Sequence, residues 1–305
     1  MSAACQEDNG KCTSNHLKSR VMKTILLPVD HSAASHNAAR YVAELSASPE
    51  YQIGRIILLN SYFVSLYEQI LPTPDFVQVG EREILEKRGG LRQHLRAIRE
   101  EMLPLVGQAV TVETMESEEP LLRSILSAVA GRKPDLLVIG SDGPGGEDPS
   151  EIAEHVIGIA RISPIPVLIV PAGKAFGGIH QVLLPSDFRN LACLAPLRVM
   201  QEDELWRNKK VLVVNVDPGF RRSEPDERFR AVSTSLEKYL AGIDWELYYS
   251  DASDTLLGIL DFAQARKADM VIALPGKHSF FYKLTHRSIS QALVRNAKVP
   301  VLILK

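Results

Sequence analysis

Two stretches of this chain carry nearly the same sequence, and this repeat constrains the fold more than any other feature. Residues 25–30 read Ile-Leu-Leu-Pro-Val-Asp, and residues 182–187 read Val-Leu-Leu-Pro-Ser-Asp. Each is an apolar strand that ends in proline and aspartate, and a helix-like segment follows each one. Self-similarity on this scale is typical of duplicated structural units. The 305 residues therefore divide into two domains of ordinary size.

The ends of the two halves also match. Residues 134–140 recur at 268–274, and residues 165–170 recur at 299–304, both with an offset of 134 residues. The first strands of the halves are instead 157 residues apart. The first half therefore contains 23 extra residues, which we place mostly within 61–90.

Each half alternates strands with helices. Strands are expected near 23–29, 54–60, 109–114, 135–140 and 166–170, and again near 181–186, 210–216, 244–249, 269–274 and 300–304. Helices are expected near 32–47, 80–103, 118–131 and 150–162, and again near 189–206, 226–241, 253–266 and 286–297. The strands are mostly continuous Val, Ile and Leu runs, which indicates a sheet covered by helices on both faces.

This pattern predicts an α/β protein of two tandem doubly wound parallel-sheet domains of Rossmann-like type. We expect a disordered tail at 1–21, a first domain at 22–172, a linker at 173–179 and a second domain at 180–305. The linker contains three glycines and follows Pro171, so neither flanking strand is expected to continue into it.

Composition narrows the class of function. The formal net charge is −2, which gives no basic field for nucleic acid. The three cysteines form no disulfide framework, and Cys5, Cys12 and His16 lack a fourth metal ligand and a zinc spacing. The first 21 residues lack the apolar region of a signal peptide, and no apolar run is long enough for a membrane span. We expect a cytoplasmic protein that binds neither nucleic acid nor membrane.

Open parallel sheets bind ligands beyond the carboxyl ends of their strands, where the strand order reverses. In each half this point lies between the first and fourth strands. Asp30 and Asp187 end the two first strands, and residues 140–143 read Gly-Ser-Asp-Gly after the fourth strand of the first half. Glycines permit close approach of the backbone, and amides at a helix start favour an anion.

The order of these motifs resembles the universal stress protein family. The family layout is a strand with Pro-x-Asp, then Gly-x-x-Gly after the fourth strand, then nine residues, then Gly followed by Ser or Thr. The resemblance covers residues 22–305 and implies a tandem UspA-type protein whose two domains form a pseudo-twofold dimer. Residues 166–170 and 300–304 are the edge strands expected to meet across that twofold.

The same resemblance implies adenine-nucleotide sites, with ATP or AMP as candidate ligands. The first-strand aspartate would contact the adenine end, and the glycine-rich loop with the later Ser or Thr would hold ribose and phosphates. The candidate nucleotide-binding residues are Asp30, Gly140, Ser141, Gly143, Asp187 and Ser288. No residue is assigned as catalytic or as a metal ligand.

The chain departs from the family pattern in both halves. In the first half Ala153-Glu154 replaces Gly-Ser/Thr, which sets a carboxylate where phosphates are expected. Like charges about 4 Å apart repel by about 4 kcal/mol at an effective dielectric of about 20. In the second half Leu274 and Lys277 replace the two glycines. Both phosphate sites are therefore expected to be weakened.

Plainer roles stay open for several of these residues. Asp30 and Asp187 are also suited to capping the helices that follow them, and the glycines of 140–146 also suit a flexible loop. The acidic side chains of that loop favour solvation over metal binding. Basic and aromatic residues at 277–287 suit either an anion or partner surface or a loop packed under the sheet. His31 and His36 have no partner in the sequence that would make either a catalytic base.

These observations favour a stress-response binding and regulatory protein that acts through a small ligand or a protein partner. The segments 61–90 and 278–286 are the surfaces expected to contact such a partner, and further homodimerisation is left open. The alternative is a nucleotide-gated switch that binds, or slowly hydrolyses, ATP in the first domain. We expect no enzyme, because neither half combines an intact phosphate loop with a nucleophile or base.

Overall fold

The computed structural model describes residues 23–63, 81–142, 151–186, 191–202, 206, 208–216, 227–274 and 298–305. The predicted tail, most of the predicted insert and the predicted helix at 286–297 lie outside these ranges.

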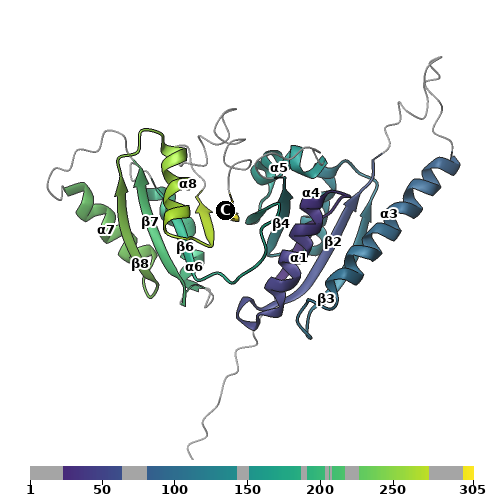
Figure 1. The fold of residues 1–305 in the computed structure, drawn as a ribbon, viewed down its shortest axis with the longest axis horizontal. Helices are drawn as coiled ribbons and strands as arrows, with labels where there is room; N and C mark the ends of the chain where they lie inside the picture. The colour runs from purple at the N-terminus through teal and green to yellow at the C-terminus, as the bar shows by residue number, and fades with distance from the viewer. Residues whose placement is uncertain are drawn as a thin grey trace, which may run out of the picture.

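Strands and helices alternate through both halves (Figure 1). The first half contains β1 (Lys23–Pro28), α1 (Ala33–Ala47), η1 (Pro49–Tyr51), β2 (Ile53–Ser61), α3 (Glu81–Met102), β3 (Thr111–Ser117), α4 (Leu121–Arg132), β4 (Leu136–Ser141), α5 (Glu151–Ile162) and β5 (Val167–Pro171). The second contains β6 (Gln181–Pro185), η2 (Leu191–Leu197), α6 (Arg198–Glu202), β7 (Lys210–Val216), α7 (Glu227–Tyr239), β8 (Asp244–Ser250), α8 (Thr255–Ala265), β9 (Met270–Ala273) and β10 (Val301–Ile303).

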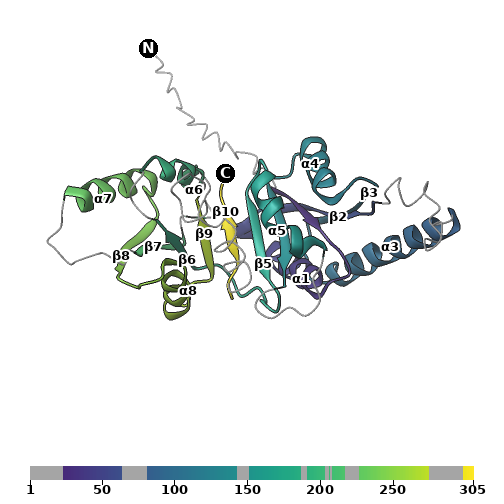
Figure 2. The same cartoon turned by 90° about the horizontal axis from the view of Figure 1, so that it is seen from above.

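The strands form one sheet in the order β3-β2-β1-β4-β5-β10-β9-β6-β7-β8. Neighbouring strands are parallel except at the centre, where β5 and β10 pair antiparallel with Leu168 opposite Leu302. Figure 2 shows β10 between β9 and β5. The two C-terminal strands of the halves therefore pair as expected, and each leaves no open edge at the centre of the sheet.

Helices cover both faces of the sheet, and each face has its own apolar core. One core takes side chains from α1, α3, η2, α6 and α7, and the other takes them from α4, α5 and α8. The inner strands β4 and β5 are buried along nearly their whole length. The outermost strands β3 and β8 contain exposed and half-buried positions, as edge strands with one free side do.

Several small features recur at the same offset as the sequence repeat. The carboxylate of Asp135 accepts a hydrogen bond from the amide of Thr24, at 2.7 Å. The carboxylate of Asp269 likewise accepts one from the amide of Gln181, at 2.9 Å. Lys133 and Lys267 both adopt positive φ where α4 and α8 end. The two aspartate hydrogen bonds join the start of each fourth strand to the first strand of its own half.

One predicted element differs from the structure. The helix expected at 189–206 is a 3₁₀ turn, η2, followed by the short helix α6. Pro196 lies inside this segment. Proline has no amide hydrogen, and its ring clashes with the carbonyl group four residues earlier, so a regular α-helix is interrupted there.

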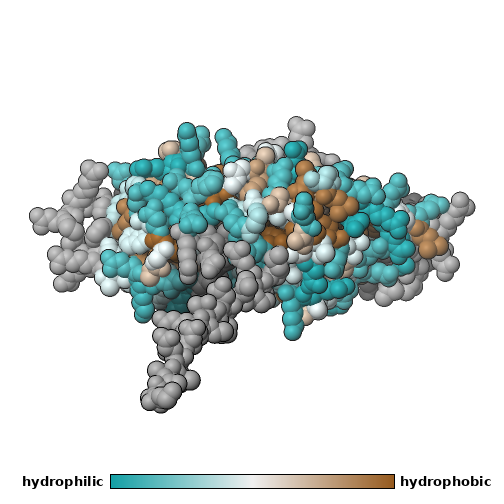
Figure 3. All heavy atoms as spheres, turned by 90° about the horizontal axis from the view of Figure 1, so that it is seen from below, coloured by the Kyte–Doolittle hydropathy of each residue, from teal (hydrophilic) through white to brown (hydrophobic). Residues whose placement is uncertain are grey.

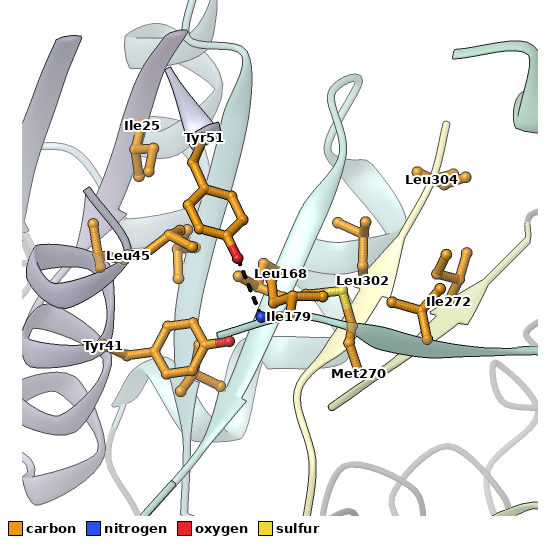
Figure 4. Packing of buried hydrophobic residues seen from close by; sticks show 14 of the residues in the cluster. Ile25, Tyr41, Leu45, Tyr51, Leu168, Ile179, Met270, Ile272, Leu302 and Leu304 are labelled. Carbon is orange, nitrogen blue, oxygen red and sulfur yellow. Dashed lines mark hydrogen bonds between the residues drawn. The ribbon is translucent and has the colours of Figure 1, made fainter. Parts of the chain in front are cut away.

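The two halves share an interface beyond the paired strands (Figure 4). The hydroxyl of Tyr51 accepts a hydrogen bond from the amide of Ile179, at 3.1 Å. The ring of Phe176 lies edge-on to the rings of both Tyr41 and Tyr51. The ammonium of Lys209, whose side chain is only 2% exposed, lies 3.2 Å from a carboxylate oxygen of Glu50 on the first half. The segment that links β5 to β6 therefore packs against Tyr41 and Tyr51 of the first half, and the pair of Lys209 and Glu50 joins the two halves directly.

Hydrophilic residues cover most of the described surface seen in Figure 3, with apolar residues in smaller patches. Among the helices that the structure describes, none combines the length and the hydrophobicity that a membrane crossing requires.

Candidate functional site

The strand order reverses between β1 and β4, as predicted. These strands pair only at Ile25–Leu136 and Leu26–Leu137, whereas β1 pairs with β2 as far as Pro28. In the second half β6 and β9 also pair over two positions only. The carboxyl ends of β1 and β4, with the residues that follow them, are called the switch point here. Ligands of open parallel sheets bind at such points.

Asp30 follows β1 and uses one carboxylate oxygen to hold the start of α1. Its Oδ1 accepts hydrogen bonds from the amide and the hydroxyl of Ser32, at 3.0 and 2.5 Å, and from the hydroxyl of Ser35, at 2.7 Å. The side chain of Ser32 in turn accepts from the amide of Ser35 and is the N-cap of α1. The predicted capping role therefore belongs to Ser32, two residues later, and Asp30 supports that cap.

Two further side chains hold the loop that carries Asp30. The amide of Asn60, at the end of β2, donates to the carbonyl oxygen of Val29 at 2.9 Å. Nε2 of His94 on α3 lies 2.9 Å from the carbonyl oxygen of Asp30. A carbonyl oxygen only accepts, so Nε2 of His94 carries the hydrogen. Sequence reasoning missed both residues, although a polar Asn directly after the run at 56–59 is a detectable signal.

Gly140 brings α1 close to the end of β4. A Cβ atom at this position would lie 2.4 Å from the carbonyl oxygen of Ala34. Only glycine fits this approach without a shift of the backbone. Gly140 therefore lets α1 pack closely on the end of β4, a role that the sequence did not indicate, and its predicted role in holding a ligand stays a prediction.

Ser141, the last residue of β4, has an unusual hydroxyl. The residue is 1% exposed, and its Oγ has no hydrogen-bond partner among the residues that the structure describes. Its backbone is well bonded, because its carbonyl oxygen accepts from the amide of Ala172 at 2.7 Å. A buried hydroxyl without a partner costs about 1–3 kcal/mol, so such groups often mark a place for a ligand or water.

The second half repeats the hydrogen bond that holds the loop after the first strand, but not the residues that end the fourth strand. Asn215 donates to the carbonyl oxygen of Ser186 at 2.8 Å, as Asn60 does to Val29. Leu274 stands at the position of Gly140, is 3% exposed and belongs to the core that also takes in η2 and α6. By the repeat offset, Ser141 corresponds to Pro275, which has no hydroxyl.

Three histidines surround the Asp30 loop in the first half. The rings of His31 and His94 are 3.9 Å apart between centroids and tilted by 38°, and the ring of His36 lies 5.3 Å from that of His94. Nδ1 of His36 lies 3.4 Å from a carboxylate oxygen of Glu101. Desolvation, followed by the charge of His94, lowers the pKa of His31 from its ordinary value.

A comparison with models of protein families decides which family the chain belongs to. The model of the universal stress protein family matches residues 22–171 and 253–305, which is more than half of the chain. The chain belongs to the universal stress protein family. Residues 172–252 lie outside the match, yet β6, β7 and β8 within them repeat the order of β1, β2 and β3.

Solved structures agree on the fold of this universal stress protein. A universal stress protein from Archaeoglobus fulgidus DSM 4304 has a TM-score of 0.63 at 15% identity and covers 93% of this chain and 96% of its own. A putative universal stress protein from Pseudomonas aeruginosa UCBPP-PA14 has a TM-score of 0.53 at 15% identity and covers 94% of each chain. No curated protein matches the sequence.

Half of the family-derived site of this universal stress protein lies within the described residues. Asp30, Gly140 and Ser141 all lie at the carboxyl ends of β1 and β4. Gly143, Asp187 and Ser288 lie outside the described residues, as do Lys277, the basic and aromatic segment and the side chain of Glu154. Within the described ranges, no group of three or more His, Cys, Asp or Glu side chains is arranged to hold a metal.

Proposed function

We propose that this universal stress protein is a stress-response regulator that binds an adenine nucleotide, ATP or AMP, in its first domain only. The second domain would serve as a structural and partner-binding half. The observation that carries this proposal is the buried hydroxyl of Ser141, which has no partner among the described residues and lies beside Gly140 at the switch point.

A bound ligand would supply the hydrogen-bond partner that the hydroxyl of Ser141 lacks among the described residues. A ribose or phosphate oxygen accepts a hydrogen bond from a serine hydroxyl, so binding would return the free energy that the unpartnered group loses. The neighbouring Gly140 leaves backbone rather than side chain at this position. Asn60, Ser32, Ser35 and His94 hold the Asp30 loop on the other side of the switch point.

The second domain offers a different surface. Leu274 adds a buried apolar side chain at the position of Gly140, and Pro275 replaces Ser141. Both changes remove groups that the first domain would use at the end of its fourth strand. The second half does keep a buried hydroxyl without a partner among the described residues, that of Ser186 after β6, so the number of ligands bound by each chain tests the proposal directly. We therefore propose one nucleotide site in each chain and no site in the second domain.

The site is proposed to bind rather than to catalyse. One oxygen of Asp30 is already shared among three donors at the start of α1, which suits a structural and ligand-positioning role. Ala153-Glu154 would weaken the hold on phosphates by charge repulsion, as argued from the sequence. A weak, reversible site suits a sensor of nucleotide level or of a related small molecule.

Isothermal titration calorimetry of the full chain with ATP and AMP tests this proposal. We expect weak binding with one equivalent in each chain. Ser141→Ala should weaken binding, and Ala153→Gly combined with Glu154→Ser should tighten ATP binding by about tenfold for each 1.4 kcal/mol of repulsion removed. Two equivalents in each chain would contradict the assignment to one domain. No tightening in the double variant would contradict the role of Glu154.

Leu274→Ala is the matched control in the second domain. It shortens the side chain at the position of Gly140, and we expect no change in nucleotide affinity. A change in affinity of the same size as that of Ser141→Ala would place the site in the second domain instead.

A further inference from the structure

The histidines beside Asp30 form a contact whose strength depends on protonation. His31 comes from the loop after β1, His36 from α1 and His94 from α3, so three separate elements meet in one cluster. His94 donates through Nε2 to the backbone of Asp30. Its second nitrogen, Nδ1, is therefore the place where an added proton must go.

Stacked imidazoles are stable only while at most one of them is charged. The centroids of His31 and His94 are 3.9 Å apart. Two positive charges at about 4 Å repel by about 4 kcal/mol at an effective dielectric of about 20, and solvent reduces this at an exposed residue such as His31. Low pH therefore destabilises the stack of His31 on His94.

The surrounding charges do not cancel this repulsion. Among the described residues, the charged or titratable groups that act on His31 are His94, Asp30 and His36. Asp30 favours a charged His31, but both histidines oppose it, and desolvation opposes it most. Glu101 lies against His36, so its carboxylate compensates that histidine rather than the stacked pair.

We propose that the stack of His31 on His94 is an acid-labile clasp that holds α3 against the Asp30 loop, and that its opening in acid weakens nucleotide binding in the first domain. The part about binding rests on the function proposed above. His94 carries the bond to Asp30. When both His94 and His31 are charged, their repulsion moves the two rings apart, so opening removes this link between α3 and the loop.

The direction of the pH effect follows from proton linkage. The pKa of His31 is lowered in the stacked arrangement, so the released arrangement binds more protons as the pH falls. The stack is therefore fully stable above the ordinary histidine pKa of about 6.5 and loses stability as the pH falls through it. Each unit by which the pKa is lowered corresponds to about a tenfold change in the equilibrium between the two arrangements.

The test begins on the ligand-free full chain. Histidine ring resonances are followed by NMR between pH 8 and 5, and amide hydrogen exchange is measured over residues 30–36 at both ends of that range. After correction for intrinsic exchange, the wild type should exchange about tenfold faster in acid for each unit of lowered pKa. Exchange that does not change with pH would overturn the clasp.

Two substitutions of the same exposed residue separate stacking from titration. His31→Phe keeps a flat ring that gains no charge, so protection of residues 30–36 should persist in acid. His31→Asn removes the ring, so exchange should already be fast at pH 8. A His31→Phe variant that keeps the full acid effect would overturn the proposal.

ATP titrations of the wild type and His31→Phe at pH 8 and 5.5 then test the link to binding. ATP itself gains a proton in this range, and that contribution is common to both proteins. The affinity of the wild type should fall more than that of His31→Phe. Equal falls would overturn the regulatory part. Absence of ATP binding at both pH values would contradict the proposed function, while the ligand-free exchange data would still decide the clasp.

Discussion

A Cβ atom on Gly140 would lie 2.4 Å from the carbonyl oxygen of Ala34, so the first turn of α1 rests on bare backbone at the end of β4. Leu274 occupies the matching position in the second half, where a 3₁₀ turn and a short helix replace the long α1. This difference of one residue between the repeats thus accompanies a different helical element after the first strand of each half.

Gly140→Ala should destabilise the protein by about 1–3 kcal/mol, because the added methyl group meets backbone that cannot move cheaply. Gly131→Ala, within α4, is the control. A Cβ atom there meets nothing within 4 Å, so stability should rise by up to about 1 kcal/mol. Urea denaturation measures both variants. Equal effects would contradict the close approach of α1.

Asn60→Ala and Asn215→Ala should each cost about 1–3 kcal/mol of unfolding free energy. Each removes the donor to a backbone carbonyl oxygen, that of Val29 or of Ser186, and leaves it without that bond in a buried setting. Exposed Asn208→Ala should be nearly neutral. Thermal denaturation compares the three variants, and a loss confined to one half would mean that the repeated bond is not equivalent in the two halves.

Asp30→Asn should lower stability as well as ligand affinity. The carboxylate accepts three bonds from Ser32 and Ser35, and a neutral amide oxygen accepts them more weakly, at a cost of about 1–2 kcal/mol. Ser32→Ala should cost about 0.5–2 kcal/mol through loss of the cap. Chemical denaturation and calorimetry are measured on the same samples. Lost affinity at unchanged stability would make Asp30 a ligand contact only.

Glu50→Ala should destabilise the chain more than Lys209→Met does. Lys209 is 2% exposed and Glu50 is 47% exposed, so removing the carboxylate leaves a buried ammonium without its ion-pair partner, whereas removing the ammonium leaves a hydrated carboxylate. We expect about 1–2 kcal/mol for Glu50→Ala and less than about 1 kcal/mol for Lys209→Met. The double variant should resemble Lys209→Met. The reverse order in urea denaturation would show that Lys209 is hydrated.

The location of the candidate site could be predicted from the sequence, but the hydrogen-bond partners around it could not. The Pro-x-Asp ends of the first strands and the run to Gly140 locate the switch point, because chain order fixes which strand ends meet in a doubly wound sheet. Asn60 stands out in the sequence as a polar residue directly after an apolar run, but the bonding partners of His94 and Asn60 could not be foreseen, since Asp30 and Val29 are 64 and 31 residues away in the chain. Such partners are chosen by packing rather than by local sequence.

The duplication, the alternation of strands and helices and the order of motifs were determined by the sequence alone, because apolar periodicity and repeat offsets are local properties of the chain. The tertiary structure decided which polar groups find partners. It set Ser32 rather than Asp30 at the start of α1, left the hydroxyl of Ser141 unpartnered among the described residues and stacked His31 on His94. Hydrogen bonding and ring contact depend on distances of a few ångströms between elements, and only the packed sheet and helices fix those distances.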